Sequence, residues 1–300
     1  MDGKFLYKLY GMNLESDLEL PQLVKLPSEE ENKGIDVVIR KGRFPEELKR
    51  EKSCWSEIKK PVALLSNDTC YLYIENGKEI TYELKENSKN PQYLGSYILG
   101  WGMTILLWQL GELGIHCSCV ANENGAVLIS GNSGSGKSTV TAFFLDHGYH
   151  LMADDIARVA LKEDGAYAYP AFPAQKFCRD VAVSRELDLD ELIHIDEDKD
   201  KFLVPYEGPF PLGSEKVRTM VFLTKIGTKE PVFREMVGFE KYMTCLNALF
   251  LKPLLKEHLT DKENAESALK MASLFPIYLS ARPFEGDTKA EVLNNLRALL

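Results

Sequence analysis

The sequence lacks the cysteine spacing of zinc-binding and disulfide-rich proteins. Its six cysteines are scattered through 300 residues, and no Cys-x-x-Cys pattern repeats. The opening MDGKFLYKLYG carries no secretory signal. We therefore expect reduced, mostly buried thiols in a cytoplasmic protein, with neither a zinc site nor a disulfide framework.

Positive charge is also scarce. Lys and Arg total 36 against 45 Asp and Glu, so the net charge is −9. An anionic chain is not attracted to nucleic acid or to an acidic membrane, and we expect neither as a partner. The 45% of hydrophobic residues is enough for a real core, and the length allows two domains.

One apolar run, residues 93–113, is long enough to raise the question of a membrane-spanning helix. Three glycines precede Trp108, and Gln109 and Glu112 stand near its end, which makes the run a poor lipid-facing span. The sequence therefore predicts a buried helix packed under a sheet.

The first ninety residues have the pattern of short strands separated by turns. Apolar runs rich in Leu, Val, Ile and Tyr alternate with Pro, Asn, Gly and charged residues. Residues 71–84 predict a hairpin, with Asn76 and Gly77 in its turn. The polar segment 85–90 is the expected boundary between a β-rich N-terminal region, residues 1–90, and a second region, residues 91–300.

The second region contains a strand–helix–strand pattern. The apolar run 126–130 predicts a buried strand, residues 137–147 predict a helix, and residues 149–153 predict a second strand. Further strands are expected around 157–161, 217–224 and 277–279. This alternation indicates a mixed α/β fold.

The strongest motif lies between the first strand and the helix. GNSGSGKS, residues 131–138, matches the phosphate-binding loop G-x-x-x-x-G-K-[ST] at every specified position. The loop's N–H groups and the helix dipole would hold the phosphates of a nucleoside triphosphate, ATP being favoured. Lys137 would reach the β and γ phosphates, and the Ser138 hydroxyl would bind Mg²⁺. The expected nucleotide-binding residues are Gly131, Ser133, Gly134, Ser135, Gly136, Lys137, Ser138 and Thr139.

Two consecutive carboxylates follow the second strand. Parallel strands of a βαβ unit end at the same edge of the sheet, so Asp154 and Asp155 should emerge beside the phosphate loop. One would hold Mg²⁺ and the other would accept the proton of an attacking hydroxyl. Which of the two takes which role is left open, and a solvated turn is the alternative.

His116 stands just before the strand that leads into the loop. A single His in an apolar run is as well explained by the core as by a site. Its neighbours Cys117 and Cys119 share one face of a strand, and buried thiols explain them better than metal ligands.

Together these residues resemble a known family. His116, the loop GNSGSGKST and the segment LMADD at 151–155 are similar to the kinase domain of HPr kinase/phosphorylase, a fold related to ATP-dependent phosphoenolpyruvate carboxykinase. The resemblance implies an α/β P-loop kinase domain of that type. It also implies that His116, Lys137, Ser138 and the two aspartates surround the transferred phosphate.

The resemblance has a narrower form. The opening YGMNLESDLELP at 10–21, the segment AYPAFP at 168–173 and the ending FPIYL at 275–279 are similar to HPr-kinase-related proteins encoded beside bacterial peptide-modification genes, some of which phosphorylate the C-terminal Ser of a lasso-peptide precursor. The Glu- and Gly-rich signature of true HPr kinases is absent. HPr as acceptor and the reverse phosphorylase reaction are therefore not implied.

The expected activity is a Mg-ATP-dependent kinase that phosphorylates a hydroxyl, a Ser of a peptide or small protein. Asp154, Asp155, Lys137 and His116 are its expected catalytic residues, and Ser138, Asp154 and Asp155 its expected metal ligands. The alternatives are a nucleotide-binding regulatory module without its own acceptor and a small-molecule kinase. The sequence leaves the oligomeric state open, a homo-oligomer included.

Overall fold

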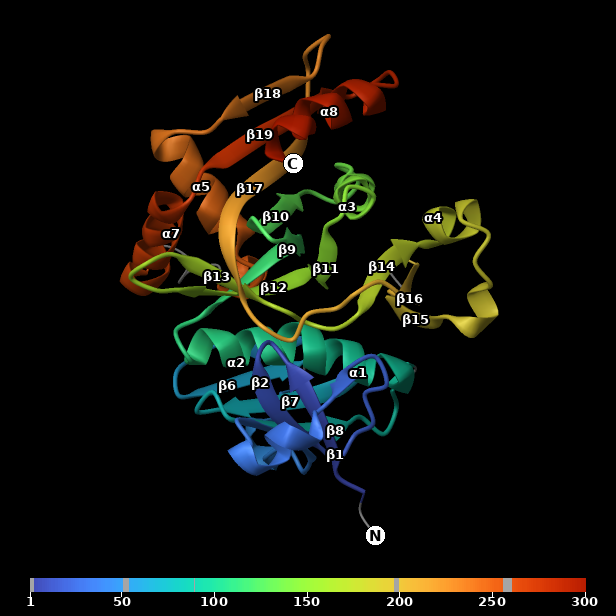
Figure 1. The fold of residues 1–300 in the computed structure, drawn as a ribbon. Coiled ribbons are helices and arrows are strands. Elements are labelled where there is room, and N and C mark those ends of the chain that lie inside the picture. The colour runs from blue at the N-terminus through green and yellow to red at the C-terminus, as the bar shows by residue number, and fades with distance from the viewer. Residues whose placement is uncertain (1–2, 51–53, 89, 197–199, 256–260) are drawn as a thin grey trace. The chain divides into compact units, whose positions relative to one another are not determined.

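The structure, a computed structural model, describes residues 3–50, 54–88, 90–196, 200–255 and 261–300. The chain forms two compact units (Figure 1). In the described parts, the N-terminal unit comprises the chain up to Gly114, Phe172–Tyr206 and Pro253–Leu255, and the P-loop unit comprises Ile115–Ala171, Glu207–Lys252 and the chain from Asp261. No single position divides the two units, and the expected boundary at residues 90 and 91 stays a prediction.

The N-terminal unit contains an eight-stranded sheet of order β3-β1-β2-β4-β8-β7-β6-β5. Its strands are β1 (Phe5–Leu9), β2 (Met12–Ser16), β3 (Val24–Lys25), β4 (Val37–Lys41), β5 (Trp55–Glu57), β6 (Val62–Ser66), β7 (Cys70–Glu75) and β8 (Glu79–Leu84). The predicted hairpin is confirmed, since β7 and β8 pair antiparallel with Ile74 opposite Ile80. Asn76 and Gly77 have φ of 56° and 64°, the left-handed backbone that a tight hairpin turn needs.

The apolar run forms the predicted buried helix. It consists of α1 (Leu94–Tyr97), a π-helical turn (Ile98–Gly102) and α2 (Met103–Gln109). Five consecutive residues at the start of α2 are buried, and α2 packs on β7 across one face of the sheet (Figure 1). Among the residues described, no helix is both long and apolar enough to cross a membrane.

A smaller sheet of order β14-β16-β15 completes the N-terminal unit. Its elements are β14 (Ala174–Cys178), α4 (Arg179–Ser184), β15 (Ile193–Asp196) and β16 (Lys201–Pro205). Ala174, Ile195 and Leu203 form its small core, with Phe172 packed against them.

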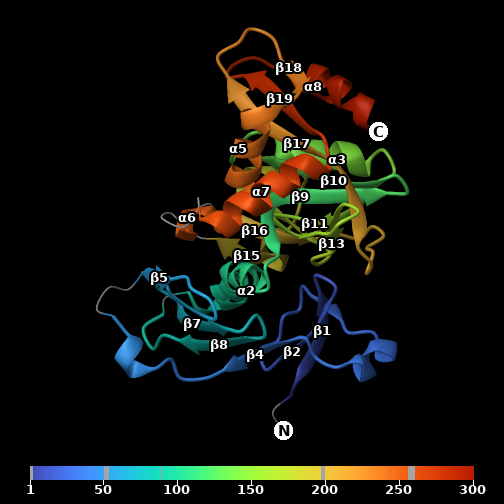
Figure 2. The same ribbon diagram turned by 90° about the vertical axis from the view of Figure 1, so that its left-hand side faces the viewer.

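The P-loop unit is built on a sheet of order β10-β9-β12-β13-β17-β19-β18, and an added pairing of β10 with β17 closes five of these strands into a ring. Its strands are β9 (Leu113–Asn122), β10 (Gly125–Gly131), β11 (His150–Ala153), β12 (Ile156–Leu161), β13 (Ala166–Tyr169), β17 (Glu215–Ile226), β18 (Val232–Glu235) and β19 (Ile277–Pro283). Its helices are α3 (Lys137–Leu145), α5 (Gly238–Ala248), α7 (Lys262–Leu274) and α8 (Lys289–Leu296). The short helix α6 (Lys252–Leu255) begins with the last residue of Glu207–Lys252 in this unit, and its other residues, Pro253–Leu255, belong to the N-terminal unit. Figure 2 shows α7 beside α5, which it contacts.

Strand direction decides where the functional groups gather. β10 and β11 both pair antiparallel with β9 and are therefore parallel to each other, while β17 is parallel to β10 and β19 is parallel to β17. The carboxyl ends of β10, β11, β17 and β19 consequently lie at the same edge of the sheet. The mixed α/β class is confirmed, and the fully buried apolar run of β10 is typical of a strand covered on both faces.

Candidate active site

The loop between β10 and α3 has the backbone of an anion cradle. Gly131, Gly134 and Gly136 have φ of 145°, 73° and 111°, so the chain curls back before α3 begins at Lys137. A Cβ on Gly131 would lie 2.3 Å from the carbonyl oxygen of Leu223 on β17. Only glycine fits at the start of this loop, both for its dihedral angle and because a neighbouring strand passes so close.

The Lys137 ammonium lies over this loop. Its Nζ donates to the carbonyl oxygens of Gly131, at 2.7 Å, and Asn132, at 3.3 Å. The side chain thus folds back from the first turn of α3 onto the loop. The positive charge stands where the loop would hold the phosphates of a nucleotide.

The hydroxyls of the loop differ in their surroundings. Ser135 is buried, and its Oγ has no hydrogen-bond partner. A buried hydroxyl without a partner costs free energy, and a bound polar ligand would remove that cost. Ser133 and Thr139 are exposed and Ser138 is half-buried in the first turn of α3, so these three remain accessible.

The two predicted carboxylates follow β11 directly, at the same edge of the sheet as the loop. Asp155 has φ of 74°, in the left-handed region that a residue other than glycine seldom adopts. Such strained backbone persists only where the surrounding structure holds it, and it is common at functional sites.

The side chains of β9 contact both carboxylates. Nδ1 of His116 lies 3.7 Å from Oδ1 of Asp155, and the hydroxyl of Ser118 donates to Oδ1 of Asp154 at 2.5 Å. The side chain of this histidine is 38% exposed and lies beside the aspartate pair, so it is not a buried core residue. Sequence reasoning missed Ser118, although its place two residues after His116 puts both on one face of a strand.

Cys117 and Cys119 occupy the opposite face of β9, and both are fully buried, as predicted. Burial raises the pKa of the Cys117 thiol well above its usual value, because a thiolate is poorly solvated there. These cysteines pack in the core and keep the other face of the strand turned toward the carboxylates.

The donor set fits Mg²⁺. The site offers the hydroxyl of Ser138 and the carboxylates of Asp154 and Asp155, and oxygen ligands of this kind are those that Mg²⁺ prefers. Within the described ranges, no group of three or more His, Cys, Asp or Glu is arranged to hold a metal by itself. A cation bound here would therefore need further ligands, such as the phosphate oxygens of a nucleotide.

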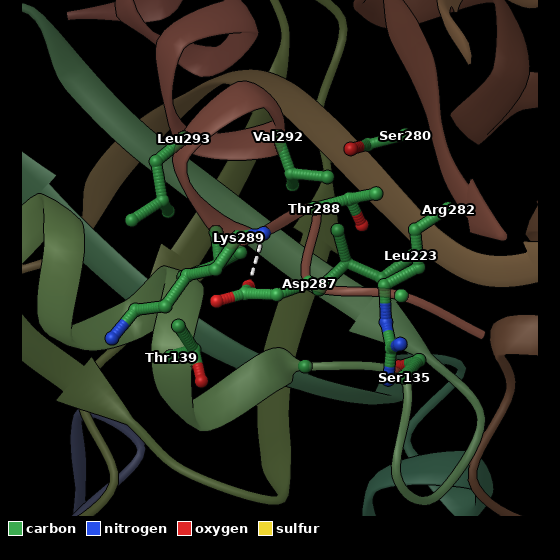
Figure 3. A pocket seen from close by; sticks show the side chains of 13 residues that line it. Ser135, Thr139, Leu223, Ser280, Arg282, Asp287, Thr288, Lys289, Val292 and Leu293 are labelled. Atoms are coloured by element: carbon green, nitrogen blue, oxygen red, sulfur yellow. Dashed lines mark hydrogen bonds between the residues drawn. The ribbon is translucent and has the colours of Figure 1, made fainter. Parts of the chain in front are cut away.

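A cavity of about 180 Å³ adjoins the loop (Figure 3). Its lining residues are Ser135, Gly136, Thr139, Val140, Leu223, Ser280, Arg282, Gly286, Asp287, Thr288, Lys289, Val292 and Leu293. The apolar members come from α3, β17 and α8. The polar members include Asp287, whose Oδ1 accepts from the backbone N–H of Lys289 at the start of α8.

Arg282 is a second residue that sequence reasoning missed. It lies on β19, and its Nη2 donates to the carbonyl oxygen of Gly134 in the loop at 3.2 Å. The sequence did carry a signal, since Arg282 comes shortly after an apolar run that predicts a strand. Nothing local revealed that this strand runs parallel to β17 and so ends at the same edge as β10.

Comparison with known proteins finds similarity to solved structures. Neither a protein-family model nor a curated protein matches the chain. The solved structures that match include the Hpr(Ser) kinase/phosphatase from Coxiella burnetii, at 12% sequence identity over 62% of this chain and 95% of that one, with a TM-score of 0.31.

Proposed function

We propose that this protein is a Mg-ATP-dependent kinase that transfers the γ-phosphate to a hydroxyl. One observation carries the proposal: the phosphate-binding loop and the aspartate pair follow parallel strands that end at one edge of one sheet. A loop alone suits any nucleotide-binding protein. Two carboxylates beside it supply what group transfer needs in addition.

The loop and Lys137 bind the triphosphate. Backbone N–H groups from Gly134 to Thr139 and the N-terminus of α3 face the phosphates, and the lysine ammonium neutralises the β and γ oxygens. The unpartnered Ser135 hydroxyl becomes a further donor to the nucleotide. These contacts position the γ-phosphate, which is most of what catalysis of phosphoryl transfer requires.

Asp154 and Asp155 divide the remaining work. One carboxylate accepts the proton of the attacking hydroxyl, and the other, with Ser138, holds Mg²⁺. Bound Mg²⁺ supplies positive charge that stabilises the phosphate oxygens. His116, at 3.7 Å from Asp155, orients that carboxylate and adds a polar group near the γ-phosphate.

The nucleoside occupies the cavity beside the loop. Leu223, Val292 and Leu293 give apolar surface for the faces of a base (Figure 3). Asp287 and Thr288 offer polar atoms for the edges of the base or for the ribose. Arg282 borders both cavity and loop, so its guanidinium can bind the base or the phosphates. ATP is the proposed nucleotide.

The proposed acceptor is the hydroxyl of a Ser on a peptide, and the C-terminal Ser is the residue that the resemblance to the peptide-modification group indicates. Support comes from the sequence resemblance at residues 10–21, 168–173 and 275–279 to the HPr-kinase-related proteins of peptide-modification gene clusters. The net charge of the chain is −9, so a strongly acidic acceptor would be repelled and is not expected.

In the test, purified protein is given Mg-ATP and one of four acceptors. These are a peptide ending in Ser, the same peptide ending in Ala, the Ser peptide with an amidated C-terminus, and free serine. ADP formation and the mass of each acceptor are measured, with nucleotide binding by calorimetry. We expect phosphate only on peptides that end in Ser. Nucleotide binding without transfer would identify a regulatory module. Turnover of free serine equal to that of the peptide would identify a small-molecule kinase. Absence of nucleotide binding would refute the whole proposal.

A further inference from the structure

Two residues of β9, separated by one position, contact two consecutive aspartates. His116 lies beside Asp155 and Ser118 bonds to Asp154, while Cys117 between them faces the core. Residues i and i+2 of a strand share a face, which explains the two contacts from β9. Consecutive residues of an extended chain would instead point to opposite sides, so the aspartates need another explanation.

The backbone at Asp155 provides it. Its φ of 74° turns the chain out of the extended conformation immediately after β11. The bend lets both carboxylates approach the same face of β9, each with its own partner. Both carboxylates are therefore held against β9 by these contacts.

The bond from Ser118 to Asp154 has the properties of a positioning contact. The donor residue is 1% exposed, so water does not compete for the hydroxyl. The oxygens lie 2.5 Å apart, as expected for an O–H donor on a charged carboxylate. A carboxylate held through Oδ1 loses rotational freedom, and the direction of its second oxygen, Oδ2, is set by the strand.

We propose that Ser118 is a positioning residue for phosphoryl transfer, acting through Asp154; this rests on the proposed kinase function. In the reaction, the acceptor oxygen gives its proton to a carboxylate and forms a bond to the γ phosphorus. The bond from that phosphorus to the β–γ bridging oxygen breaks, and its electron pair leaves with ADP. Whether Asp154 takes the proton or holds the cation, its oxygen must be placed to within a fraction of an ångström.

Removal of the hydroxyl should therefore lower turnover without loosening nucleotide binding. Deleting a group that orients a reacting side chain costs about 10–100-fold in activity. The phosphate loop and Lys137 lie on other elements, so nucleotide affinity should stay within about twofold. A purely structural role would change stability instead and would affect both quantities together.

The experiment measures ADP formation from saturating Mg-ATP with water as acceptor, so that no peptide substrate needs to be known. Ser118→Ala should lower the rate about 10–100-fold, with nucleotide affinity by calorimetry unchanged, and Ser118→Thr should restore part of the rate. Thr219→Val is the control, since it removes a buried hydroxyl of the same unit that donates to the backbone carbonyl of Pro276. If Ser118→Ala does not fold, Ser118→Cys keeps the volume and leaves only a weak donor.

A double-mutant cycle identifies the partner. Ser118→Ala should cost nothing further in an Asp154→Asn background, and its full cost in an Asp155→Asn background. An unchanged rate in Ser118→Ala, or an equal cost in both backgrounds, would overturn the positioning role. A wild-type protein that forms no ADP, either with water or with the peptide that ends in Ser, would instead refute the kinase function on which the role rests, and these two failures are distinct.

Discussion

The P-loop unit and the N-terminal unit each contain a cavity lined by charged side chains, and the two differ in what their polar groups already bind. The cavity of the N-terminal unit is the larger, about 1020 Å³ against about 180 Å³ beside the loop. Its lining residues are Arg43, Glu46, Lys49, Asp68, Thr69, Tyr71, Glu83, Lys85, Glu86, Asn87 and Asn90. By volume alone, it would be the first choice for a binding site.

Its lysines, however, are occupied by neighbouring side chains. Lys49 bonds to Glu46 at 2.7 Å and to Glu83 at 2.9 Å, and the ammonium groups of Lys49 and Lys85 lie 5.2 and 4.4 Å from the centre of the Tyr71 ring. These groups form a surface network that stabilises the unit. In the loop cavity, Ser135 has a buried hydroxyl with no partner. A small cavity whose lining includes an unsatisfied hydroxyl therefore suits a polar ligand better than a larger cavity whose lysines are already paired.

The largest expected effect is the loss of Lys137. Lys137→Ala removes the ammonium that lies over the carbonyls of Gly131 and Asn132, and we expect transfer to fall by about 10³-fold, since one lost charge-stabilising donor costs that much. Arg should not restore it, because a planar guanidinium does not replace a compact ammonium. ADP formation is the measurement. Lys270→Met, at an exposed lysine whose Nζ donates to the carbonyl of Leu161, is the control.

The aspartate pair should have the next largest effect. Asp154→Asn and Asp155→Asn keep the size and remove the charge, and at least one should lower turnover about 100-fold or more. Raising Mg²⁺ should partly rescue the variant that loses the metal ligand but not the one that loses the base. Asp164→Asn, at an exposed aspartate that accepts a hydrogen bond from Tyr167, is the control. Wild-type rates in both variants would mean that the two aspartates have no catalytic role. The proposed nucleotide site would not be affected by that result.

Arg282 tests whether the loop cavity binds the nucleotide. Arg282→Met removes the guanidinium that bonds the carbonyl of Gly134, and nucleotide affinity should fall about tenfold. Arg234→Met, on the neighbouring strand β18, removes an arginine that is paired with Glu240, and it should leave the affinity unchanged. Calorimetry with ATP measures both. Equal affinities in the two variants would indicate that the nucleotide does not bind in this cavity.

The N-terminal cavity should show the smallest effect, and on stability alone. Burial raises the pKa of Glu83, but hydrogen bonds from Lys49 and the backbone N–H of Phe44 outweigh it, so the net pKa is lowered from 4.5. This contribution is present above pH 4.5 and is lost as the pH falls through the lower pKa of the folded state. Lys49→Met should lower the free energy of unfolding by about 1 kcal/mol at neutral pH and by less in acid.

Urea unfolding at several pH values measures this difference. Lys59→Met removes a more exposed ion pair, to Glu57, and should cost less. Nucleotide affinity should be the same in both variants. A large loss of nucleotide affinity in Lys49→Met would indicate that the nucleotide binds in the larger cavity of the N-terminal unit and not in the cavity beside the loop.

Predictions from local sequence were the ones that the structure confirmed. The hairpin at Asn76 and Gly77, the buried helix that begins at Leu94 and the strand–loop–helix around Lys137 all follow from neighbouring residues. The place of the aspartate pair was also predictable, because a βαβ unit leaves little choice about where its second strand ends. The π-helical turn at Ile98–Gly102 was not predicted, since an apolar pattern does not distinguish it from a regular helix.

The sequence by itself determined the loop. Its two features, a glycine with a left-handed φ and a lysine in the first turn of the following helix, depend only on residues that are adjacent in the chain. The tertiary structure alone decided the partners of that loop. Ser118 reaches Asp154 across 36 positions, and Arg282 reaches Gly134 across 148. These contacts depend on strand order and register, which are set by the packing of the whole sheet, and no local pattern encodes them.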